Sequence, residues 1–147
     1  MMFPARLLTA TAALTMLIGV AAVAQPVARA NPEPPPGPPL RHVQYTVFAE
    51  QPHTAEIYYR DTDPPNWGEY SHNPYLYTPN VEAEVGPGKQ WNLEVWLADP
   101  DQWAMVVAGI ESDSTQTPNL HCVLAVDGVV VKTAQGPKGA LCSIRPW

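Results

Sequence analysis

A chain of 147 residues with 14 acidic and 8 basic side chains has a formal charge of −6 at pH 7. Its basic residues form no cluster, which argues against nucleic acid or an anionic membrane surface as the main partner. Charged residues make up 15% of the chain, below the ~25% of typical domains, whereas prolines number 18. This composition favours one compact, loop-rich, all-β extracellular domain.

The first 30 residues have the pattern of a secretory signal peptide. Arg6 precedes an uncharged run at 7–24, and small-x-small sites follow at 22–24 and 28–30. We expect cleavage after Ala30 and a secreted or extracytoplasmic location, where a disulfide can form. The alternative is an uncleaved helix that anchors the protein in the cytoplasmic membrane, because the run nearly reaches the ~20 residues that a spanning helix needs.

Residues 31–40 form a proline-rich tether with six prolines. Proline fixes φ near the polyproline II value and lacks a backbone N–H, so this segment is typical of a stiff spacer rather than of a core element. A ligand for a proline-recognition domain is the alternative use. We therefore expect the folded domain to span residues 41–147.

Alternating apolar and polar residues predict strands along the folded part, at 42–47, 55–60, 81–85 and 91–97. The apolar run from Trp103 to Ile110 predicts a central strand. Turn residues separate these runs, at 86–89 and 99–101. About seven short strands, with no sustained helical period after the signal, predict an all-β fold: a small immunoglobulin-like β-sandwich.

The last third of the folded part contains both cysteines and a strong hairpin signal. Asp127-Gly128 lies between two β-branched runs, which predicts a two-residue turn with Cys122 facing Thr133 and Leu124 facing Val131. Cys122 then points into an apolar layer, where Cys142 can reach it one strand later. We expect one disulfide between Cys122 and Cys142.

Three segments and the late cysteine together resemble the C-terminal domain of the mycobacterial MmpS proteins. The segments are HVQYTVF at 42–48, AEIYYRD at 55–61 and CVLAVDG at 122–128, and the cysteine is Cys142. The resemblance covers most of residues 41–147. It implies a small immunoglobulin-like sandwich outside the cytoplasmic membrane, accessory to MmpL exporters of lipids or siderophores. This chain differs from MmpS proteins in its cleavable signal, where they retain a transmembrane helix, and in a longer, more aromatic segment at 61–80.

That segment, residues 61–80, contains aromatic side chains that either cover the core or bind an apolar or sugar ligand. Five of its residues are proline or glycine, so it is neither helix nor strand throughout. We expect Tyr59 and Tyr77 to point inward, with Trp67 and Tyr70 exposed at the tip. The candidate binding residues are Trp67, Tyr70 and Tyr75.

No pattern of catalytic or metal-binding residues stands out. No serine lies in a nucleophile-elbow context, and the four histidines are scattered without ligand spacing. A calcium loop or a glycosidase pair is the alternative use of several acidic residues, for which solvated loop carboxylates and Asx turns are the simpler interpretation. Those residues are Asp61, Asp63, Glu69, Asp99 and Asp101. We expect no catalytic residue, no metal and no cofactor.

The sequence thus predicts a non-catalytic secreted or periplasmic binding domain. The expected partner is an envelope protein, such as an MmpL-type transporter, or a lipid-like molecule, and a membrane only if the signal is uncleaved. A structural secreted antigen or interaction protein without a small ligand is the alternative, and a hydrolase is the third.

Overall fold

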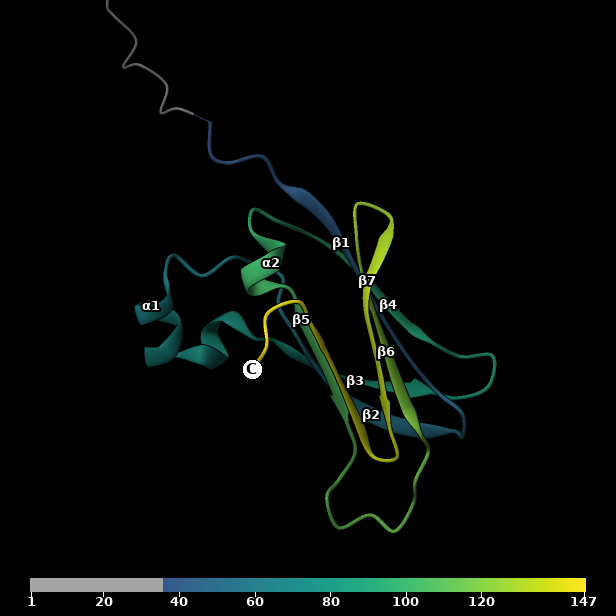
Figure 1. Ribbon diagram of the computed structural model, residues 1–147. Helices are drawn as coiled ribbons and strands as arrows, with labels where there is room; N and C mark the ends of the chain where they lie inside the picture. The colour runs from purple at the N-terminus through teal and green to yellow at the C-terminus, as the bar shows by residue number, and fades with distance from the viewer. Residues whose placement is uncertain (1–35) are drawn as a thin grey trace, which may run out of the picture. The chain divides into compact units, whose positions relative to one another are not determined.

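The computed structural model describes residues 36–147 as a β-sandwich of eight strands (Figure 1). One antiparallel sheet has the order β4-β1-β6-β7 and the other β3-β2-β5-β8. The predicted signal peptide and residues 31–35 of the tether lie outside the described residues. Residues 36–40 are exposed and lead into β1. The strands are β1 (Arg41–Ala49), β2 (His53–Tyr59), β3 (Asn80–Val85), β4 (Trp91–Leu97), β5 (Met105–Gly109), β6 (Leu120–Val126), β7 (Val129–Gly136) and β8 (Gly139–Ser143).

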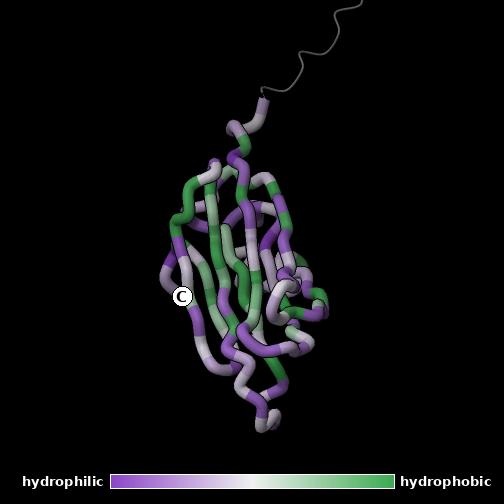
Figure 2. Tube along the Cα trace, turned by 90° about the vertical axis from the view of Figure 1, so that its right-hand side faces the viewer, coloured by the Kyte–Doolittle hydropathy of each residue, from purple (hydrophilic) through white to green (hydrophobic). Residues whose placement is uncertain are grey.

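The core lies between the two sheets and follows the predicted alternation. In β1 every second residue is buried, and Val43, Tyr45 and Val47 have no exposed surface. The apolar residues of the neighbouring strand β6 lie beside them on the same face of the sheet and continue the same layer. Figure 2 shows hydrophobic stretches along the strands and mostly hydrophilic connections. The all-β sandwich is confirmed, with eight strands instead of about seven.

Three short helices interrupt the β structure: α1 (Trp67–His72), the 3₁₀ helix η1 (Pro74–Tyr77) and α2 (Pro100–Trp103). The central strand predicted from Trp103 to Ile110 is present as β5, but it begins only at Met105, because residues 100–103 form a helical turn. The Asp99 side chain caps this turn by accepting the Gln102 N–H at 3.2 Å, and Pro100 occupies its first position.

The β6–β7 hairpin has the predicted turn but a shifted register. Asp127 and Gly128 both have positive φ, 51° and 79°, as a two-residue turn of this type requires. A bulge at Val131, opposite the step from Leu124 to Ala125, adds one residue to β7. Cys122 therefore pairs with Ala134 instead of Thr133, and Leu124 pairs with Lys132 instead of Val131.

The predicted disulfide between Cys122 and Cys142 is present, with both cysteines buried. Cys122 belongs to the sheet of β1 and Cys142 to the sheet of β2, so the bond joins the two layers of the sandwich. Both sulfurs lie in the core cluster, which fits the inward orientation expected from the alternation in β6.

Removal of this bond should destabilise the domain strongly. The cysteines are 20 residues apart, and closing a loop of this size in the unfolded chain is worth ~3 kcal/mol. We expect Cys122→Ala and Cys142→Ala each to lower the free energy of unfolding in urea by about that amount. The double variant should cost little more than either single one, because the second cysteine no longer has a partner. Two titratable thiols in the native protein would contradict the assignment.

Asp127 also ties the hairpin turn to the start of β1. Its carboxylate accepts the Arg41 Nε–H at 3.0 Å and the His42 backbone N–H at 3.1 Å, and its own N–H donates to the His42 carbonyl at 2.8 Å. The Arg41 bond, with a smaller contribution from His42, holds the pKa of Asp127 below its ordinary value of 3.8.

This contact should make stability depend on pH only in acid. Because the folded pKa of Asp127 is lowered, the stabilisation is present above pH 3.8 and is lost as the pH falls through the lower folded pKa. We expect an NMR titration of the Asp127 carboxyl carbon to show a midpoint below 3.8, and Arg41→Gln to move it back towards that value. An unchanged midpoint in the variant would show that Arg41 is not the cause.

Candidate functional site

The feature around which the site is built is the buried Arg60, the residue that follows β2. Arg60 has no exposed surface. Its guanidinium carbon lies 4.4 Å from the ring centre of Tyr70, and 5.5 Å from the ring centres of both Trp103 and Trp147. The cation is therefore enclosed by aromatic rings that come from α1, α2 and the end of the chain.

The Arg60 side chain is fully buried but forms only one hydrogen bond with the described residues. Nη2 donates to the Thr78 hydroxyl at 3.3 Å, whereas Nε and Nη1 are buried without a partner among residues 36–147. A buried cation without a carboxylate is costly, and each favourable cation–π contact returns roughly 0.5–2 kcal/mol. The surrounding rings thus supply most of the stabilisation that an ion pair would otherwise give.

The backbone of Arg60 is fixed by the sandwich core. Its carbonyl accepts the Tyr45 hydroxyl at 2.7 Å, and its N–H donates to the Met105 carbonyl at 3.1 Å. The same Tyr45 oxygen accepts the Met105 N–H at 3.3 Å, and burial raises the pKa of this hydroxyl well above its usual range. Tyr45 remains a neutral donor and connects β1 to the strand ends that hold the site.

Local capping places α1 over this end of the sandwich. The Asn66 side chain accepts the Glu69 N–H at 2.9 Å and so begins α1. Trp67 and Tyr70, three residues apart, then lie on one side of the helix. Asp63 fixes the start of the segment, because its two carboxylate oxygens accept the N–H groups of Ala98 and Asp99 at 2.7 and 2.8 Å.

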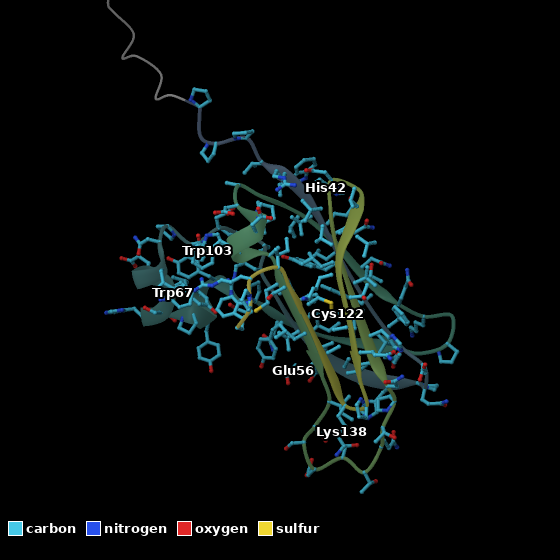
Figure 3. All side chains as sticks on the ribbon, viewed as in Figure 1. His42, Glu56, Trp67, Trp103, Cys122 and Lys138 are labelled. Atoms are coloured by element: carbon cyan, nitrogen blue, oxygen red, sulfur yellow. A yellow bond between two sulfur atoms is a disulfide. The ribbon has the colours of Figure 1, made fainter. Side chains whose placement is uncertain are left out.

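The six residues gathered here form what we call the aromatic–arginine cluster. Trp67 lies 5.3 Å from Tyr70, 5.9 Å from Trp147 and 6.2 Å from Trp103, measured between ring centres. The Arg145 guanidinium lies over the Trp67 ring at 4.0 Å. Figure 3 shows Trp67 and Trp103 on the side of α1 and α2, with Cys122 inside the sandwich. The cluster consists of Arg60, Trp67, Tyr70, Trp103, Arg145 and Trp147.

An open hollow of about 660 Å³ lies beside the cluster, a size within the ~300–1,000 Å³ typical of small-molecule sites. Its walls combine apolar and charged side chains. They are Trp67, Asp99, Asp101, Gln102, Ile144, Arg145 and Pro146. The hollow has the dimensions of a binding site, while its openness suits a ligand that stays partly in water.

The structure brings together two of the three predicted binding residues. Trp67 is 44% exposed, as expected at a surface. Tyr70 is half-buried against Arg60, so its predicted exposure at a tip was wrong. Tyr75 is 79% exposed and belongs to neither the cluster nor the hollow. Of the tyrosines predicted to point inward, Tyr59 packs against the core and Tyr77 is half-buried.

Sequence reasoning missed Arg60, Trp103, Arg145 and Trp147. Arg60 ends an alternating strand, where a charged residue normally lies in solvent. Two of the rings that enclose it, those of Trp103 and Trp147, lie more than forty and more than eighty positions further along the chain. No local sequence pattern connects residues so far apart. The available signal was the presence of large aromatic side chains at 67, 70, 103 and 147.

Two of the acidic residues that could have formed a calcium loop or a glycosidase pair have structural hydrogen bonds. The carboxylates of Asp63 and Asp99 accept hydrogen bonds from backbone N–H groups. Within residues 36–147 no three His, Cys, Asp or Glu side chains converge as metal ligands would. In the same part of the chain no helix has the length and hydrophobicity needed to cross a membrane.

Fold and site together define a single-disulfide β-sandwich domain with an aromatic–arginine cluster at one end. The chain belongs to the Rv2576c β-sandwich domain family, whose model matches residues 45–142. It is 34% identical over 110 residues to the uncharacterized proteins Rv2576c of Mycobacterium tuberculosis and Mb2606c of Mycobacterium bovis, which covers 74% of this chain and 70% of each relative. The family match includes Arg60, Trp67 and Trp103 and ends before Arg145.

Replacement of the buried Trp103 should destabilise the domain more than replacement of the partly exposed Trp67. Trp103 is 4% exposed and Trp67 is 44% exposed. We expect Trp103→Ala to cost about 3–5 kcal/mol of unfolding free energy, as truncations of buried aromatics do. Trp67→Ala should cost about 1 kcal/mol, in the range of partly exposed positions. Urea unfolding followed by circular dichroism measures both, and equal losses would contradict the assignment of Trp67 to a binding surface.

Proposed function

We propose that this domain is a non-catalytic binding module that works outside the cytoplasm and holds a component of the cell envelope at the aromatic–arginine cluster. The observation that carries the proposal is the partly exposed Trp67–Arg145 stack, at 4.0 Å, next to a hollow of about 660 Å³. Exposed tryptophan and arginine are the residues most often found at binding hot spots. The interlayer disulfide suits an oxidising compartment.

The partner would be an envelope protein or a lipid-like molecule. The resemblance of the sequence to the C-terminal domain of MmpS proteins supports a role beside an MmpL-type exporter. The open shape of the hollow favours a ligand that is only partly enclosed, such as the head group of a lipid or a segment of a protein. A lipid tail would need a more enclosed cavity than this open hollow provides.

Catalysis is not part of the proposal. The side chain of Asp101 at the hollow is 72% exposed, and Asp99 caps α2. A general acid for glycoside hydrolysis needs a desolvated carboxyl group. A hydrolase therefore stays the third candidate, to be tested with a substrate panel.

An interaction protein without a small ligand is the second candidate, and the hairpin tip favours it. Val129, Val130 and Val131 begin the edge strand β7 and are 63%, 57% and 43% exposed. β-Branched residues on an open edge are suited to pairing with another chain.

Native mass spectrometry of the full chain, purified from the envelope of a mycobacterial host, tests the proposal. The wild type should retain a bound lipid-like mass or a protein partner, and Trp67→Ala and Arg145→Ala should each lose most of it. Trp96→Ala is the matched control, because Trp96 is 58% exposed on β4 and outside the cluster. A bound species that is retained equally by all variants would place the binding surface elsewhere. A wild type with nothing bound would contradict the proposal and favour a structural role without a small ligand.

A further inference from the structure

Arg145 offers hydrogen-bond donors to the hollow that no other residue uses. Its guanidinium stacks on Trp67 at 4.0 Å and lies 5.1 Å from the ring centre of Trp147. Among residues 36–147 its side chain forms no hydrogen bond or ion pair, although a guanidinium has five N–H donors. Ser143 holds the Arg145 backbone in place by donating its hydroxyl to the Arg145 carbonyl. The planar donor group is thus fixed by stacking and remains available.

Acceptors face the same hollow. Asp99 uses Oδ1 for the Gln102 N–H, at 3.2 Å, and its Oδ2 accepts no hydrogen bond from the described residues. The nearest cation to Asp101 is Arg41 at 4.0 Å, the limit of an ion pair, and both side chains are largely exposed. The Gln102 amide adds a group that both donates and accepts.

Apolar surface completes the wall. The side chains of Trp67, Ile144 and Pro146 line the hollow between the charged groups. Aromatic and aliphatic surface of this kind packs against the C–H face of a ring, while polar groups at its edge hydrogen-bond to substituents.

This mixture discriminates between ligand classes. A simple anion would be repelled by Asp99 and Asp101, and a simple cation would leave the N–H donors of Arg145 without an acceptor. A hydrocarbon chain would take these charges out of water without replacing their hydrogen bonds, which costs free energy. A hydroxyl group both donates and accepts, so a ring with several hydroxyls can satisfy the guanidinium, the carboxylates and the amide together.

We propose that the hollow between Asp101 and Arg145 binds a sugar, either free or as the head group of a glycolipid, with the sugar ring packed against Trp67. This rests on the proposed function, namely that the cluster end is a binding surface, and specifies the part of the ligand that enters it. Since the hollow is open, the sugar exchanges with solvent on one side and binds weakly, in the range of millimolar dissociation constants.

The test is an NMR titration of the purified full chain that follows the indole N–H of Trp67. The probes are neutral disaccharides (maltose, cellobiose and lactose), phosphatidylcholine vesicles, and the same vesicles containing a neutral glycolipid. We expect a saturable shift with at least one disaccharide if the free sugar suffices. A shift only with glycolipid vesicles would assign the site to the head group. Plain vesicles should produce no shift.

Variants at the polar wall give the result its specificity. Arg145→Ala and Asp101→Ala should each weaken binding about tenfold, as loss of a charged hydrogen-bonding partner does. Arg145→Lys should also bind more weakly, because it keeps the charge but loses the planar donors. Lys89→Ala and Glu94→Ala, exposed charged residues outside the hollow, are the matched controls and should bind as the wild type does.

Two results would overturn the inference: no shift with any sugar or glycolipid, or sugar binding that is unchanged in Arg145→Ala and Asp101→Ala. The envelope experiment separates this failure from that of the proposed function. If Trp67→Ala and Arg145→Ala lose the envelope ligand while no sugar binds, the binding surface stands and its sugar specificity is wrong. If those variants bind the envelope ligand normally, the proposed function itself fails.

Discussion

Burial of the Arg60 guanidinium is the constraint on which the functional end of this domain depends. A buried cation without a carboxylate must be stabilised by what surrounds it, and here Tyr70, Trp103 and Trp147 do so with their ring faces. These rings come from α1, α2 and the last residues of the chain, and they also pack against one another. One side chain thereby organises three separate segments into a single surface.

The sandwich contributes a rigid frame for this surface. Tyr45, deep in β1, fixes both the Arg60 carbonyl and the Met105 N–H through one hydroxyl oxygen. The Cys122–Cys142 bond joins the layers behind the site. Binding residues on irregular segments at the end of a β scaffold are a common arrangement, because the strands fix positions that loops alone could not hold. The exposed Trp67–Arg145 stack follows from this frame as the outer layer of the cluster.

The sequence predicted what local periodicity encodes. Alternation located β1, β2, β3, β4 and β6 closely, and the inward orientation of Cys122 predicted the disulfide. The helical turn of α2 was missed because the cap at Asp99 and Pro100 outweighs the apolar run that follows. The bulge opposite Leu124 was missed because one inserted residue leaves the hairpin pattern unchanged. Trp67 and Tyr70 were found by their aromatic character alone. The roles of Arg60 and Trp147 could not be predicted from the sequence, because their contact joins positions that only the folded chain brings together.

The most direct measurement of the central claim is the exchange and chemical shift of the Arg60 Nε–H, observed by NMR in the isotopically labelled protein. If the guanidinium is enclosed by rings, this proton exchanges slowly with water and is shifted by ring currents, whereas the same proton in the urea-unfolded protein serves as the rapidly exchanging reference. The account predicts that Trp103→Ala removes both effects while Trp67→Ala leaves them largely in place. An Arg60 Nε–H that exchanges in the folded wild type as fast as it does in the unfolded protein would contradict the account.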